Sequence, residues 1–362
     1  MLGWLRVRRR KEAKATTGAL PGITVLIAAR NEAHNLQQHL PAILKQDYPQ
    51  FEVLVVLNQT RDHSVGVLAQ LKKTHSHLRW IDLEDVPADW APKKWAIEQG
   101  VRGAQFEHLA LTDADCCPES GWLKGMGERF AQGYEVVLGL GMYQRYGGWL
   151  QQFIQYETWY TAWQYIGAAA WGRPYMGVGR NLGYTRNFFL RNGGLERWKA
   201  SLSGDDDLLI GAYGPSARTT EMIKSGTWTW SEPPKGWEEW WRQKTRHVSA
   251  SSHYSLINRG LLGAFHLSQL GMHLGILIGL LIQATAWPLW GLYICTIVVK
   301  WGAFGILPKE EGVRTLHTYF PGLEITHFLY NLSVVPIGLI KRPEWKNRIP
   351  EYQKTRKRID NL

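Results

Sequence analysis

The chain has 362 residues, 45% of them hydrophobic, and its 42 Lys and Arg residues exceed its 31 Asp and Glu residues, giving a formal net charge of +11. This length suits one large domain with an extension or two domains, and the positive charge favours an anionic partner such as a nucleotide or a membrane surface. The sequence has neither zinc-finger spacing nor an RNA-binding aromatic signature, so no nucleic acid is expected as a partner. The three cysteines lack C-x-x-C spacing, which argues against a disulfide framework and favours a reducing cytosol.

Residues 1–20 are predicted to form a basic N-terminal segment ahead of the folded domain. Arg6, Arg8 and the residues 9–11 are all basic, and no apolar core follows them, so we do not expect a signal peptide. With Trp4 beside these charges, the segment either lies on an anionic membrane surface or forms a disordered tail, and both interpretations stay open.

Strand-like runs alternate with helical runs over the next ninety or so residues. The β-rich runs are residues 22–32, 51–57, 78–82 and 109–111, and the helical runs are residues 35–46, 64–73 and 93–103. Such alternation predicts a parallel sheet with helices on both faces, which binds its ligands beyond the carboxyl ends of the strands.

Three polar loops fall at these strand ends, at residues 29–32, 58–62 and 113–115. The last of them carries two carboxylates one residue apart, Asp113 and Asp115, which can hold a divalent cation against a diphosphate. A lone Asp-x-Asp is more often a solvated turn. Three polar loops on one edge of a single sheet favour a nucleotide pocket instead.

The ordered motifs from about residue 22 to 254 resemble those of the family-two glycosyltransferases, in the membrane-attached, cellulose-synthase-like branch. The resemblance implies a GT-A, nucleotide-diphospho-sugar-binding fold, which is an α/β, Rossmann-like mixed sheet, followed by C-terminal transmembrane helices. The run Ala28-Ala-Arg-Asn-Glu32 is similar to the first-strand motif of the family. It implies that the nucleoside is contacted by Ala29, Arg30, Asn31 and Glu32.

Three further motifs carry the resemblance to the donor site. Residues 58–62 match the second-strand loop, which implies nucleotide contacts from Asn58 and Asp62, although Leu57 and Asn58 replace the usual Asp pair and leave the base unspecified. Residues 93–96 look like the Lys-x-x-Ala segment, which places Lys93 and Lys94 as point charges on phosphate. Residues 112–116 are similar to the metal motif. That motif implies that Asp113 and Asp115 bind Mg²⁺ or Mn²⁺ and that Asp113 also faces the diphosphate.

A second acidic cluster, residues 203–208, contains three adjacent carboxylates that repel one another. In a partly buried site this repulsion raises the pKa of at least one of them, which suits a general base. The cluster looks like the family's Thr-Glu-Asp motif with Gly204 in the place of Glu, which gives Asp205 the role of the base. Asp206 takes that role if the register shifts by one residue.

Residues 237–247 resemble the Gln-x-x-Arg-Trp motif, with Gln243 and Arg246 three positions apart on one helical face. Both are predicted to reach the acceptor or the diphosphate. His247 replaces the stacking Trp, so synthesis of long polymers is disfavoured.

Aromatic residues recur every three or four positions between Trp149 and Trp163, which indicates a helix with one aromatic face. Such a face either packs in the core or lies at a membrane interface or acceptor groove, and the sequence leaves both open.

The last third of the chain is predicted to be membrane-associated. Residues 260–282 contain no Lys, Arg, Asp or Glu, and residues 286–307 contain only Lys300, so each run is long enough to cross a hydrocarbon core of about 30 Å. Residues 320–340, with Glu324 inside, either cross or lie re-entrant. The rule that basic residues stay on the cytosolic side favours the re-entrant placement.

The predicted domains are therefore residues 21–255 for the glycosyltransferase, 256–342 for two to three membrane helices and 343–362 for a basic cytosolic tail. The expected function is inverting transfer of a sugar from a nucleotide-diphosphate donor to a lipid or membrane-proximal glycan acceptor at the cytosolic face of the inner or plasma membrane. A single base without a nucleophilic carboxylate favours inversion. A non-catalytic nucleotide-sugar-binding subunit and a processive polysaccharide synthase remain alternatives.

Overall fold

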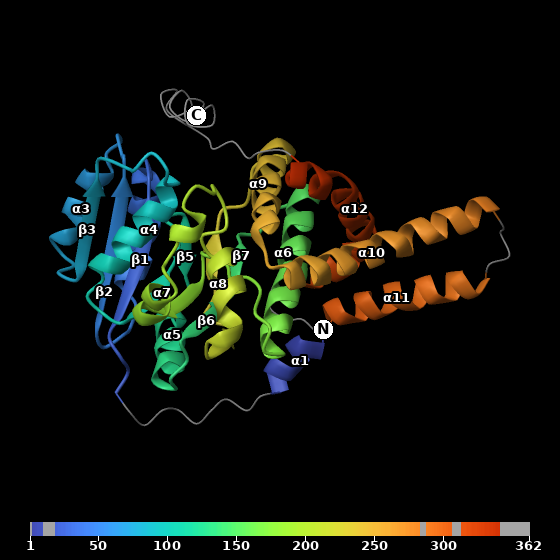
Figure 1. Cartoon of the computed structure of the whole chain (residues 1–362), viewed down its shortest axis with the longest axis horizontal. Coiled ribbons are helices and arrows are strands. Elements are labelled where there is room, and N and C mark those ends of the chain that lie inside the picture. The colour runs from blue at the N-terminus through green and yellow to red at the C-terminus, as the bar shows by residue number, and fades with distance from the viewer. Residues whose placement is uncertain (1, 10–18, 283–286, 306–312, 341–362) are drawn as a thin grey trace. The chain divides into compact units, whose positions relative to one another are not determined.

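The computed structural model describes residues 2–9, 19–282, 287–305 and 313–340 (Figure 1). They form two compact units. Leu2–Met142 and Gln164–Glu232 belong to the first, here called the sheet unit, and Tyr143–Trp163 belongs with residues 233–340 to the second, the helical unit. The predicted basic tail at 343–362 and residues 10–18 of the basic N-terminal segment lie outside the described residues.

The main sheet of the sheet unit is mixed. Across the sheet its strands follow the order β3 (Leu78–Leu83), β2 (Phe51–Asn58), β1 (Ile23–Ala29), β4 (His108–Leu111), β8 (Leu182–Thr185), β6 (Val136–Gly139) and β9 (Thr219–Met222). The strands β1 to β4 are parallel, but β8 is antiparallel to both β4 and β6. The strands β6 and β9 are parallel to each other as well, so β8 is the strand of this sheet that runs in the opposite direction. The prediction of a purely parallel sheet was therefore wrong at β8, and the mixed sheet implied by the resemblance is confirmed.

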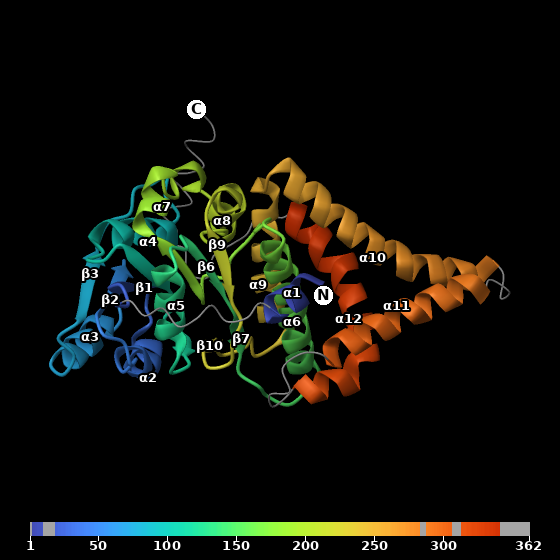
Figure 2. The same ribbon diagram turned by 90° about the horizontal axis from the view of Figure 1, so that it is seen from below.

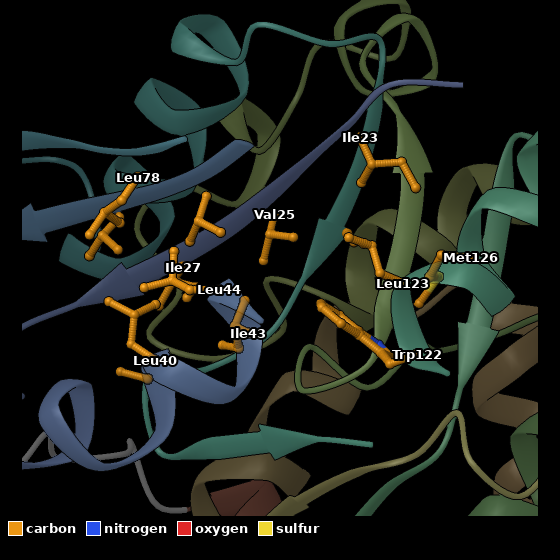
Figure 3. Close-up of a cluster of buried hydrophobic side chains, with 14 of the residues drawn as sticks. Ile23, Val25, Ile27, Leu40, Ile43, Leu44, Leu78, Trp122, Leu123 and Met126 are labelled. Carbon is orange, nitrogen blue, oxygen red and sulfur yellow. The ribbon is translucent and has the colours of Figure 1, made fainter. Parts of the chain in front are cut away.

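Helices cover β1 on both faces. The predicted helices appear after β1, β2 and β3 as α2 (Ala33–Leu44), α3 (Ser64–Lys72) and α4 (Pro92–Gly103). Val25 and Ile27 pack with Leu40 of α2 and with Trp122 of α5 (Trp122–Ala131) in one buried cluster (Figure 3). On α4, a Cβ at Gly100 would lie 2.3 Å from a Leu26 methyl carbon, so glycine is needed for this close approach.

A three-stranded sheet, in the order β5 (Cys116–Pro118), β10 (Thr229–Ser231) and β7 (Gly141–Tyr143), continues the chain beyond β4. The acidic turn with Asp113 and Asp115 therefore connects a strand of the main sheet to a strand of the small sheet. Two further short helices of this unit are α7 (Arg186–Arg191) and α8 (Asp207–Tyr213), and α1 (Leu2–Arg9) begins the described chain.

The aromatic face of α6 (Trp149–Ala170) is mostly core. Phe153, Tyr156 and Tyr160 are buried, while Trp149 at the start of the helix is 43% exposed. In the helical unit Phe153 packs edge-on against Trp240 of α9 (Trp237–Ala250), with ring centroids 5.4 Å apart. Most of this aromatic face therefore packs in the interior, as expected for the first of the two interpretations.

Three long helices complete the helical unit. They are α10 (Leu256–Ile282), α11 (Trp287–Gly305) and α12 (Val313–Ile340) (Figure 2). Among the described residues, Leu256–Gly279 is the one helical stretch that is both long and apolar enough to cross a membrane. The crossing of the other two predicted segments stays a prediction.

Two charged residues within these apolar helices are paired with each other. Lys300 of α11 donates to Glu324 of α12, and the buried Glu324 also accepts from the Tyr156 hydroxyl of α6. By contrast, α10 and α11 expose large apolar side chains, with Leu267 68% and Leu292 67% exposed. Polar groups thus face inward and apolar groups outward in this part of the unit, the reverse of an ordinary surface helix.

Candidate functional site

A pocket in the sheet unit collects the polar residues of three separate loops. Its apolar wall is formed by side chains of β1, β4, β8 and α4, and its empty volume is about 330 Å³, including space open to solvent. Its polar lining comes from the start of α4, the end of β4 and the turn before α8, and it consists of Lys93, Thr112, Asp113, Asp205 and Asp206. Residues more than ninety positions apart therefore face one another.

Lys93 lies between the two predicted acidic groups. Its Nζ is 2.9 Å from Asp113 Oδ1 and 3.1 Å from Asp205 Oδ2. Burial lowers the pKa of Lys93, but the nearby carboxylates of Asp113, Asp205 and Asp206 outweigh it and hold that pKa well above its usual value. Lys93 is therefore a cation, and it joins the acidic turn after β4 to the acidic turn before α8.

The position of Lys93 follows from how α4 begins. Pro92 stands in the first turn of α4, where its missing N–H costs nothing. The side-chain amide of Asn58, at the end of β2, donates a hydrogen bond to the carbonyl of Pro92. An aspartate in ionised form has no proton to donate, so Asn58 replaces the usual acid with a group that ties β2 to α4.

The two adjacent aspartates before α8 have different surroundings. Asp206 accepts hydrogen bonds from the backbone N–H of Gly179 at 2.6 Å and of Asp207 at 2.9 Å, and it caps α8. Burial, and then the charge of Asp205, raise the pKa of Asp206 to about 6. The backbone at Gly204 has a φ of +79°, which a glutamate would adopt only with strain.

Asp205 itself is held in its charged form. Burial raises the pKa of Asp205, but Lys93 and Lys94 outweigh it, so that the pKa lies below its usual value. The sequence predicted one carboxylate with a raised pKa in this cluster. The structure assigns that shift to Asp206, because Lys93 pairs with Asp205 and leaves Asp206 to the backbone amides.

Negative charge accumulates around Asp115. Burial raises its pKa, and the neighbouring Asp113 raises it further. The pKa of Glu32 is likewise raised, mainly by burial and also by Asp115, Asp113 and Asp62. A cation placed among these carboxylates would relieve their repulsion. In the part of the chain that the structure describes, no three His, Cys, Asp or Glu side chains form a complete metal site.

Residues 24–189 match the model of the family described as Glycosyl transferase family 2. This part of the chain is therefore similar to glycosyl transferase family 2. The matched range includes Lys93, Asp113 and Asp115 but ends before Asp205, so it is the fold that brings Asp205 close to Lys93 in the matched range.

Two curated relatives match parts of the chain. Glycosyltransferase AglE of Haloferax volcanii is 33% identical over 126 residues, which are 34% of this chain and 40% of that protein. The probable glycosyltransferase YdaM of Bacillus subtilis is 24% identical over 253 residues, 66% of this chain and 57% of that protein. The matched part thus spans about half the length of these relatives.

A solved structure shares the fold of nearly the whole chain. The mannosyltransferase PcManGT from Pyrobaculum calidifontis, in complex with GDP-Man and Mn²⁺, superposes with a TM-score of 0.54 at 18% identity. The match covers 92% of this chain and 94% of that chain. It supports a GT-A fold for this chain.

The residues predicted to contact the nucleoside lie at the ends of β1 and β2. Ala29 is buried. Asn31 has a φ of +55°, and its side-chain oxygen accepts a hydrogen bond from the backbone N–H of Arg61 at 2.8 Å. Asp62 accepts from the backbone N–H of Ala33 at 2.8 Å and from Ser64. The two loops are therefore tied to each other through the side chains of Asn31 and Asp62.

Arg30 and Lys94 are placed differently from each other. The buried Nε of Arg30 has no hydrogen-bond partner among the described residues, and burial lowers the pKa of its guanidinium. Lys94 is buried, and its Nζ donates to the carbonyl of Trp198 at 3.0 Å. Burial lowers the pKa of Lys94 to about 8. Lys94 thus anchors α4 and does not line the pocket, whereas Lys93 does.

Gln243 and Arg246 belong to α9 in the helical unit. The side-chain amide of Gln243 donates to the Tyr143 hydroxyl at 3.1 Å, and Lys244 between them forms a buried ion pair with Glu157. Their participation in the reaction stays a prediction. The structure also adds Gly179, whose backbone N–H holds Asp206, and the only sequence signal for it was the glycine-rich run at residues 176–184.

Proposed function

We propose that this chain is an inverting glycosyltransferase that moves a sugar from a nucleotide-diphosphate donor to an acceptor hydroxyl. The observation that carries the proposal is the convergence of Lys93, Asp113 and Asp205 in one pocket beside the carboxyl edge of the sheet. The similarity to glycosyl transferase family 2 supports it, as does the structural neighbour whose complex contains GDP-Man and Mn²⁺.

Asp113 and Asp115 would hold Mg²⁺ or Mn²⁺. The residues fit such an ion because their carboxylates are hard oxygen ligands, and because burial and mutual repulsion raise the pKa of Asp115. Mg²⁺ in particular is commonly bound by one or two carboxylates, with water and substrate phosphate as further ligands. When bound, the ion supplies neutralising charge for the diphosphate that leaves.

Asp205 would take the proton from the acceptor hydroxyl. Its pKa lies below the usual value, so the carboxylate is ionised and able to accept a proton at neutral pH. Asp206 is a weaker candidate, because both of its oxygens accept backbone hydrogen bonds. A single base opposite the leaving group produces inversion at the anomeric carbon. Lys93 lies within the same pocket and adds a positive charge for the diphosphate.

The acceptor is proposed to be a lipid or a membrane-proximal glycan, with the catalytic domain on the cytosolic face of the inner or plasma membrane. Leu256–Gly279 supplies a helix of membrane-spanning length, and only 6% of its apolar window is buried in the protein. We expect the expressed chain to stay with the membranes during alkaline carbonate extraction. Its appearance in the soluble fraction would contradict the membrane assignment.

Release of nucleoside diphosphate tests the proposed activity. The purified full chain, in detergent and with Mn²⁺ or Mg²⁺, is incubated with a panel of UDP- and GDP-sugars, and the released UDP or GDP is measured. We expect metal-dependent release from at least one donor, by transfer or by slow hydrolysis. Binding of donor without release from any of them would instead favour a non-catalytic nucleotide-sugar-binding subunit, and a polymeric product would favour a processive synthase.

A further inference from the structure

The ammonium group of Lys93 places a positive charge in the pocket. The Nζ of Lys93 forms ion pairs with Asp113 at 2.9 Å and with Asp205 at 3.1 Å, so one ammonium group bridges carboxylates from two different loops. The Lys93 and Asp113 side chains are 29% and 31% exposed, and the Asp205 side chain is 14% exposed.

A divalent ion and the Lys93 ammonium compete for Asp113. One oxygen of Asp113 is taken by Lys93, and two cations within a few ångströms repel each other in a partly buried site. The backbone of Lys93 is held by the start of α4, which the amide of Asn58 ties to β2. The four-carbon side chain can nevertheless swing to another anion while that backbone stays in place.

We propose that Lys93 is an internal counter-cation that opposes metal binding at Asp113 and is released from Asp113 by the donor diphosphate. The inference rests on the proposed metal site. When the diphosphate enters, it gives the ammonium a new anionic partner, and Asp113 becomes available to the ion. Metal and diphosphate therefore bind with positive coupling, each raising the affinity for the other.

The same bridge links donor binding to the base. As long as Lys93 holds Asp205, the carboxylate faces an ammonium within the pocket. Movement of Lys93 towards the diphosphate leaves Asp205 free to accept a hydrogen bond from the acceptor hydroxyl. The acceptor is thus activated after the donor is in place, an order that limits reaction with an incomplete site.

Two binding measurements on the full chain in detergent test the proposal, with a Lys93→Met variant that keeps the length of the side chain and removes its charge. Mn²⁺ alone is titrated by electron paramagnetic resonance of the free ion, and inorganic pyrophosphate alone is measured by equilibrium dialysis. We expect Lys93→Met to bind Mn²⁺ about tenfold more tightly and pyrophosphate about tenfold more weakly than the unaltered chain. Loss of structure would weaken both, so the opposite signs identify the counter-cation.

Lys124→Met is the matched control, because Lys124 is exposed on α5 and its replacement removes the same charge outside the pocket lining. It should leave both affinities unchanged. Mn²⁺ binding that depends on Asp113 but is unchanged or weaker in Lys93→Met overturns the counter-cation and leaves the metal site standing. If Asp113→Asn leaves Mn²⁺ binding unaltered in both backgrounds, the proposed metal site fails as well.

Discussion

Asp205→Asn is expected to lower the rate of sugar transfer by about 100- to 10 000-fold, the usual contribution of a general base. The amide has nearly the same size as the carboxylate but cannot take up the acceptor proton. Because the proposed metal ligands Asp113 and Asp115 are unaltered in this variant, we expect the metal-dependent affinity for nucleotide to change little. Steady-state transfer rates and equilibrium nucleotide binding, measured on the same preparation, separate the two effects.

Asp206→Asn is the informative control for this variant. Asn at 206 still has an oxygen that accepts the hydrogen bond from Gly179, so we expect a loss of less than about tenfold. A large loss in Asp206→Asn, together with near-normal turnover in Asp205→Asn, would move the role of base to Asp206. That result would mean that the register of the acidic cluster is shifted by one residue.

Asp113→Asn is expected to lower transfer on the order of a thousandfold and to raise the Mn²⁺ concentration needed for half-maximal rate. Removing one carboxylate ligand costs several kcal/mol of charge stabilisation at the leaving diphosphate, and each 1.36 kcal/mol corresponds to a factor of ten in rate. Rates measured across a titration of Mn²⁺, after treatment of the protein with EDTA, check both expectations.

Asp89→Asn serves as the comparison for the metal experiment. Asp89 is an exposed carboxylate that pairs with Lys199 at 2.8 Å and lies outside the pocket lining. Its replacement should leave the metal requirement unaltered. Full activity of the unaltered chain in EDTA, or a normal metal response in Asp113→Asn, would be inconsistent with a metal held by Asp113 and Asp115.

Much of the fold could be predicted from local sequence patterns. The apolar runs at residues 51–57 and 109–111 match β2 and β4 to within one residue at each end, because a strand covered on both faces needs continuous apolar side chains. The antiparallel direction of β8 had no such signal. Its pairing with β4 and β6 depends on hydrogen bonds between residues far apart in the chain, and a short apolar run is compatible with either direction.

The structural role of Asn58 could not be predicted from its motif. The departure from the family's Asp pair was visible in the sequence and was interpreted as a change in the nucleotide contact. In the structure the side chain of Asn58 is 3% exposed and supports the start of α4, and thereby the position of Lys93. Every residue has a backbone carbonyl, so the residue type at position 92 does not indicate that its carbonyl accepts a hydrogen bond from Asn58. A single sequence therefore cannot reveal this contact.

The sequence alone was enough to predict which residues carry the chemistry, since the acidic pairs and Lys93 are the residue types that a diphosphate, a metal ion and a hydroxyl proton require. Only the tertiary structure decided how those charges share one pocket. In the structure Lys93 forms its ion pair with Asp205, whereas the Asp206 carboxylate accepts hydrogen bonds from backbone N–H groups. Electrostatic interactions in a partly buried site depend on separations of a few ångströms, which are set by the packing of α4, β4 and α8 and not by the order of residues along the chain.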